Sequence, residues 1–81
     1  MKYLVTVIDA IHDGFGWSAN GSYVERHEID NSQDAWPTHA SLWREVRRVA
    51  GYTGARGRWL DDCTWMPYNT VIMIHLSEIH E

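Results

Sequence analysis

Four segments of the chain have the hydrophobic pattern of β-strands. Residues 2–10 and 70–79 carry apolar side chains at even and odd positions alike, which predicts two central strands. Residues 22–29 predict an outer strand with one wetter face. One face carries Tyr23, Glu25, His27 and Ile29, and the other carries Val24, Arg26 and Glu28. A shorter alternation from Trp59 to Met66 predicts a fourth strand.

One segment has the period of an amphipathic helix. Apolar side chains recur every three or four residues between Thr38 and Ala50, and the arginines fall on the other side. Asp34 and Thr38 are the two candidates for the N-cap, because their side-chain oxygens can accept hydrogen bonds from the first turn. Gly51 stands where a left-handed residue usually ends a helix. The pattern predicts a helix that packs its apolar stripe on the sheet.

Turn-forming residues separate these elements. Glycines and the Asn20-Gly21 pair predict a long loop, His12–Gly21, that joins the first two strands as a hairpin. A second loop, residues 51–58, carries three glycines. The order β-β-α-β-β therefore predicts an α+β fold, with a four-stranded antiparallel sheet and one helix packed on one face. The other face stays open unless aromatic side chains or a partner cover it.

The composition indicates one globular domain, residues 1–81, with 44% hydrophobic and 22% charged residues. The only cysteine, Cys63, cannot form an intramolecular disulfide, which favours a reducing compartment. We find no targeting segment and no apolar run near the ~20 residues that span a bilayer. We therefore expect a cytoplasmic protein without membrane contact.

Charge is unevenly distributed along this acidic chain, whose formal net charge is −4. Five arginines and only one glutamate lie between Arg44 and Arg58, and aromatic residues are interleaved with them. Arginine matches phosphate bidentately and aromatic rings stack on bases, so this segment predicts a site for phosphate, a nucleotide or nucleic acid. The candidate binding residues, for an anion or a protein partner, are Arg44, Arg47, Arg48, Arg56, Arg58, Trp43, Tyr52 and Trp59.

The alternative is that the helix arginines form a solvated face, where their charge suits a helix C-terminus. The net negative charge also opposes attraction to a polyanion, and the chain has no phosphate-binding loop or dinucleotide fingerprint.

Catalytic and metal-binding patterns are weak. The five histidines have no compact metal-ligand spacing, so we predict no metal and no cofactor. Asp9, His12 and Asp13 could gather at the end of the first strand, but turn formation by Asp13-Gly14 explains that composition equally well. A small domain with one helix offers little concave volume. We predict that the protein is not an enzyme.

The aromatic content favours a binding surface. The chain holds five Trp and four Tyr, and one helix cannot cover both faces of a sheet, so some of these rings should remain exposed. Trp, Tyr and Arg dominate interface hot spots. Our first hypothesis is a non-catalytic protein-binding module, and an exposed aromatic patch also fits a homodimer.

The opening segment KYLVTVIDAIHDGFGW, a strand that runs into a Gly-Trp loop, resembles small accessory proteins encoded by bacteriophages and prophages. The resemblance covers about the first 25 residues. It implies a compact protein that binds and disables a host protein or ribonucleoprotein in the host cytoplasm, as anti-CRISPR and other counter-defence proteins do. Those families share no catalytic residues that this sequence could inherit.

Overall fold

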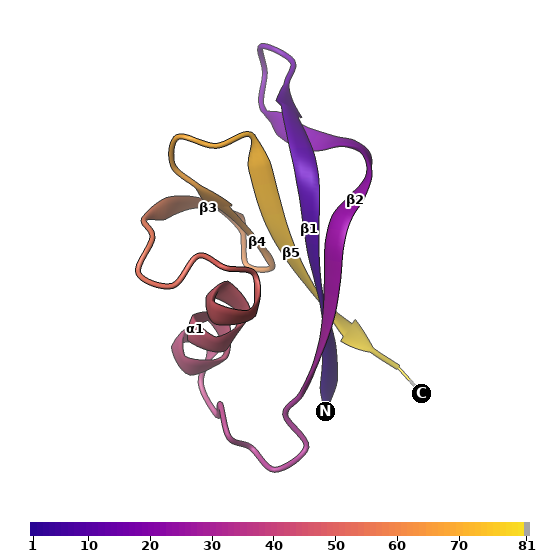
Figure 1. Cartoon of the computed structure of the whole chain (residues 1–81), viewed down its shortest axis with the longest axis vertical. Helices are drawn as coiled ribbons and strands as arrows, with labels where there is room; N and C mark the ends of the chain where they lie inside the picture. The colour runs from indigo at the N-terminus through magenta and orange to yellow at the C-terminus, as the bar shows by residue number, and fades with distance from the viewer. Residues whose placement is uncertain (81) are drawn as a thin grey trace.

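The computed structural model describes residues 1–80, apart from the side chain of Ser22. These residues form one helix and five strands, which follow in the order β1 (Lys2–His12), β2 (Trp17–Asp30), α1 (His39–Val49), β3 (Gly57–Asp61), β4 (Thr64–Pro67) and β5 (Ile72–Ile79). The strands make one antiparallel sheet of order β2-β1-β5-β4-β3, and α1 lies on one side of it (Figure 1). The α+β content agrees with the sequence, but the predicted four-stranded β-β-α-β-β sheet is wrong.

The additional strand arises from a tight turn within the segment that was predicted to be one strand. The side-chain Oδ1 of Asp61 accepts a hydrogen bond from the backbone N–H of Cys63 at 2.8 Å, which reverses the chain between β3 and β4. Trp59 then pairs with Trp65 across the hairpin. The turn contains no glycine or proline, so the segment was interpreted as one strand.

The first hairpin is also tighter than predicted. Asp13 Oδ1 accepts hydrogen bonds from the backbone N–H groups of Phe15 and Gly16, at 2.9 and 3.0 Å, and closes a short turn there. The Asn20-Gly21 pair does not form the loop and instead lies inside β2, where the register with β1 shifts. Gly21 has a φ of 81°, a left-handed conformation that suits glycine at an irregularity in a strand.

The remaining element predictions are confirmed. β1 and β5 are interior strands of the sheet, and β2 is an end strand. Thr38 rather than Asp34 is the N-cap of α1: its side chain accepts a hydrogen bond from the backbone N–H of Ser41 at 3.0 Å. Gly51 follows the helix with a φ of 88°.

The main core lies between α1 and the sheet. It contains ten buried side chains from the helix, its C-cap and four of the strands, namely Val5, Val7, Ile29, Leu42, Trp43, Val46, Ala50, Trp65, Ile74 and Leu76. Gly57 in β3 lies directly against this core, because a Cβ at that position would lie 2.6 Å from the Trp65 indole. The absence of a side chain at Gly57 lets β3 approach β4 and Trp65 closely.

A smaller apolar cluster lies on the opposite, open face of the sheet. Ala10, Met66 and Met73 are buried there, and Ile8, Trp17 and Leu60 pack against them. The alternation of β1, β4 and β5 places these side chains away from α1. Within residues 1–80 there is no helix long and apolar enough to cross a membrane.

Candidate binding groove between helix α1 and strand β3

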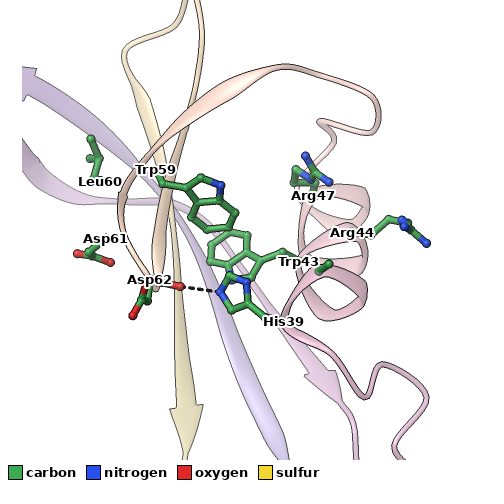
Figure 2. A pocket seen from close by; sticks show the side chains of 9 residues that line it. His39, Trp43, Arg44, Arg47, Trp59, Leu60, Asp61 and Asp62 are labelled. Carbon is green, nitrogen blue, oxygen red and sulfur yellow. Dashed lines mark hydrogen bonds between the residues drawn. The ribbon is translucent and has the colours of Figure 1, made fainter.

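A groove of about 570 Å³ runs between α1 and the β3–β4 hairpin. We call it the α1/β3 groove, and its lining residues are His39, Ala40, Trp43, Arg44 and Arg47 from the helix with Trp59, Leu60, Asp61 and Asp62 from the hairpin. Figure 2 shows the imidazole and the two indoles gathered between the helix and β3. The volume lies within the range of small-ligand and side-chain pockets, ~300–1,000 Å³.

The base of the groove is aromatic. Trp43 is buried in the core, and its ring centre lies 4.7 Å from that of Trp59 at an interplanar angle of 85°. This edge-to-face arrangement is a favoured geometry for aromatic pairs. The His39 ring centre lies 5.3 Å from that of Trp59. Trp59 is 48% exposed, so a large apolar surface faces solvent while its buried neighbour fixes its position.

A hydrogen bond connects the helix to the hairpin at the end of the groove. His39 Nε2–H donates to the backbone carbonyl of Asp62 at 3.0 Å (Figure 2). The carbonyl can only accept, so this contact assigns the proton to Nε2. His39 lies in the first turn of α1 and Asp62 in the turn of the hairpin. The bond therefore ties together the two elements whose separation sets the width of the groove.

The two sides of the groove carry opposite charges. Arg44 and Arg47 lie on the helix side, and Asp61 and Asp62 on the hairpin side (Figure 2). Within residues 1–80 neither arginine forms an ion pair; the Arg47 guanidinium carbon lies 5.4 Å from the centre of a Trp65 ring. Arg44 extends outward from the helix at the rim. A ligand in the groove therefore meets cationic groups on one side and carboxylates on the other.

The structure divides the eight predicted binding residues into two groups. Trp43, Arg44, Arg47 and Trp59 line the α1/β3 groove. The other four lie elsewhere, and they are Arg48, Tyr52, Arg56 and Arg58. The arginine-rich segment is consequently not one continuous surface.

Each residue in the second group has a different environment. Arg48 is held by Glu45 through two hydrogen bonds, of 2.5 and 2.6 Å, which lower the pKa of the Glu45 carboxyl. Arg58 has its guanidinium carbon 5.6 Å from the ring centre of Tyr68. Tyr52 is half-buried against the main core, and Arg56 is exposed.

Sequence reasoning missed the acidic side of the groove and His39. Asp61 and Asp62 were both interpreted as strand residues, which holds for Asp61 at the end of β3, whereas Asp62 lies in the turn that follows. His39 precedes Trp43 by four residues, a spacing that places both on one side of a helix. That spacing was the available signal, but the histidines were considered only as metal ligands or as part of a catalytic cluster.

The other candidate chemistries find no assembled site among the described residues. Residues 1–80 contain no group of three or more His, Cys, Asp or Glu side chains placed to hold a metal ion. The Asp13 carboxylate accepts the hydrogen bonds that form the β1–β2 turn. The hydrogen bonds from Phe15 and Gly16 lower its pKa, so the carboxylate stays ionised there. Cys63 lies exposed in the β3–β4 turn.

Comparison with known proteins gives no relative from which to infer a function. No protein-family model matches the chain, and neither a curated protein nor a solved structure is significantly similar to it. The groove itself is thus the basis for a functional proposal.

Proposed function

We propose that this is a non-catalytic binding protein that holds a short segment of another protein in the α1/β3 groove. The observation that carries the proposal is the half-exposed Trp59 seated on the buried Trp43 between oppositely charged sides. Interface hot spots are enriched in Trp and Arg and are most effective when their side chains are held in place before binding. The aromatic contacts and the His39–Asp62 hydrogen bond provide that support.

The charges at the groove favour a polypeptide over a nucleic acid. Arg44 and Arg47 attract anions, but Asp61 and Asp62 stand opposite them and repel phosphate at the same site. A peptide can present an apolar side chain to Trp59 together with acidic and basic neighbours for the two sides. The groove volume of about 570 Å³ accommodates one or two large side chains, which would form the centre of a larger contact.

A phosphate or nucleotide ligand is the second candidate. The observation in its favour is that two arginines without ion pairs within residues 1–80 lie beside an exposed indole that can stack on a base. This ligand would use Arg44, Arg47 and Trp59 but would have to avoid the two aspartates. Its binding should weaken steeply with added salt.

The test is a peptide-display selection against the folded protein, with the Trp59→Ala variant as counter-selection. The resemblance of the N-terminal segment to phage accessory proteins makes a bacterial proteome the first library. We expect enriched peptides that contain a large apolar residue with charged neighbours. Calorimetry should then show that Trp59→Ala weakens binding at least about tenfold, as expected for a hot-spot residue.

Two adjacent arginines provide a matched control. Arg47 lines the groove, whereas Arg48 is bound to Glu45 outside it, so Arg47→Ala should weaken the selected peptide and Arg48→Ala should not. Equal effects of the two substitutions, or no peptide that distinguishes wild type from Trp59→Ala, would contradict the proposal. Salt-sensitive binding of nucleotides or oligonucleotides that is lost in Arg47→Ala would instead support the second candidate.

A further inference from the structure

Strand β2 ends the sheet and has one edge free within residues 1–80, where it pairs only with β1. Asn31 N–H donates to the Met1 carbonyl at 2.7 Å, so the backbone groups of this odd-numbered residue point toward β1. Backbone direction alternates along an antiparallel strand. In the regular part of β2, residues 25–30, the N–H and C=O groups of Arg26 and Glu28 therefore point outward along the free edge.

The side chains of these two residues lie on the same face. Arg26 is opposite Thr6 and Glu28 opposite Leu4 in the β1–β2 register, which places both on the open face of the sheet. Both are exposed, and Glu28 has no ion pair with any described residue. The Arg26 guanidinium carbon lies 4.1 Å from the ring centre of Tyr23, which holds the cation close to this edge.

We propose that the free edge of β2 pairs antiparallel with β2 of a second copy, about a two-fold axis at His27. In this register the outward backbone groups of Arg26 meet those of Glu28 in the second copy, and the reverse pair forms by symmetry. Each cation then faces a carboxylate on the open face. The two sheets become one continuous sheet through the pairing of residues 25–29.

The charge sequence selects this register over its neighbours. The outward groups belong to even-numbered residues, so a symmetric ladder can be centred on Arg26, His27 or Glu28. Centring on Arg26 opposes two arginines. Centring on Glu28 pairs Arg26 with Asp30 of the second copy but opposes the two glutamates. Charged residues commonly protect an edge strand from foreign strands. Here, among the three registers, only the one centred on His27 has complementary pairs without like charges opposed.

The inference is independent of the proposed function. The α1/β3 groove involves β3, at the opposite end of the sheet from β2. Both grooves of a dimer would stay open, so the loss of peptide binding in Trp59→Ala should leave the oligomeric state unchanged. A failure of the dimer would likewise leave the groove proposal standing.

Analytical ultracentrifugation with charge variants tests the pairing. The ladder is short, so the measurement should span roughly 1 µM to 1 mM, where small interfaces dissociate. We expect Arg26→Glu and Glu28→Arg each to raise the dissociation constant at least about tenfold, because each opposes like charges twice in the symmetric dimer. The double variant Arg26→Glu with Glu28→Arg restores opposite charges and should recover the wild-type constant.

Cysteine cross-linking tests the position of the axis, in a Cys63→Ser background that removes the native thiol. At the axis, residue 27 of one copy faces residue 27 of the other, with Cα atoms about 4.5 Å apart, which is close enough for a disulfide. His27→Cys should cross-link under mild oxidation. Glu25→Cys is the matched control, because its two copies would lie four residues apart along the strands, about 14 Å.

Three results would overturn the proposal. The first is a wild-type protein that stays monomeric over the whole concentration range. The second is a dimer that neither single charge reversal weakens, and the third is equal cross-linking at positions 25 and 27. Circular dichroism of each variant should match wild type, since Arg26 and Glu28 are exposed and contribute nothing to the core.

Discussion

The two faces of the sheet bury side chains in different ways. Helix α1 covers one face and encloses Val5, Val46 and Ile74 at 0% exposure, whereas no second layer of residues 1–80 covers the other. On the open face Met66 and Met73 are nevertheless buried, at 3% and 6% exposure, by neighbours within the same sheet. A side chain on the covered face is therefore buried by a rigid opposing layer. A side chain on the open face is buried to a similar extent by neighbours that can rearrange.

The largest expected effect is a difference in the free energy of unfolding between substitutions at two adjacent residues of β5. Ile74 faces α1, and Met73 faces the open side. Ile74→Ala should lower the free energy of unfolding by about 4–5 kcal/mol, near the upper end for such substitutions, because helix and sheet cannot collapse into the cavity. Met73→Ala should cost about 2 kcal/mol, since neighbours on an uncovered face can move into the space.

Urea unfolding followed by fluorescence measures both values in the same series. If Ile74→Ala prevents folding, Ile74→Val offers a smaller deletion, with an expected cost of about 1–1.5 kcal/mol. Equal losses for Ile74→Ala and Met73→Ala would show that the open face is as tightly constrained as the covered one.

An intermediate effect concerns the polar centre of the open face. The hydroxyl of Thr64, itself 6% exposed, hydrogen-bonds His75 Nδ1 at 2.9 Å across the β4–β5 pair. Thr64→Val keeps the shape of the side chain but removes this bond, and should cost about 1 kcal/mol. The same unfolding assay measures it. No loss would indicate that water replaces the hydroxyl at His75 without penalty.

The smallest effect concerns the Glu45–Arg48 pair of α1, in which Arg48 lowers the pKa of Glu45 by hydrogen bonding its carboxylate. The folded state then binds a proton less readily than the unfolded chain. The pair therefore stabilises the protein above the unfolded pKa of about 4.3, and this contribution is lost as pH falls through the folded value. Glu45→Gln should cost about 0.2–0.5 kcal/mol at neutral pH.

That cost should shrink in added salt and disappear in strongly acidic solution, as measured by thermal unfolding at several pH values. A difference between Glu45→Gln and wild type that persists unchanged at low pH would mean that the carboxylate charge is not its source.

Hydrophobic periodicity predicted the interior strands and the helix because each of these depends on a local pattern with one physical cause. The N-cap was narrowed to Asp34 or Thr38 by side-chain type, and the structure selects Thr38. The number of strands was wrong because the reversal after Asp61 uses a side-chain hydrogen bond and contains no glycine or proline. The length of the loop before β2 was overestimated because its sequence holds more turn-forming residues than the turn uses. Two turn-forming signals occur there, and the tight turn at Asp13 leaves Asn20-Gly21 to form an irregularity in the strand.

Half of the predicted binding residues share the α1/β3 groove because Trp43, Arg44 and Arg47 occupy one side of a helix that faces Trp59. The carboxylates opposite them were out of reach of sequence reasoning, since their position depends on the hairpin that was not foreseen. Arg48 could not be separated from Arg47 by charge alone. Its removal from the site is due to Glu45, three residues earlier on the helix.

The central ladder of the sheet has a consequence for how the protein is made. β1 pairs with β5 in a register that places Lys2 opposite Ile79, so the middle of the sheet joins the two most distant parts of the described chain. Such a contact closes a very long loop and cannot form during synthesis until β5 has left the ribosome. Until then β1 and β2 can form only an isolated hairpin, and folding of the full sheet should be slow and concerted.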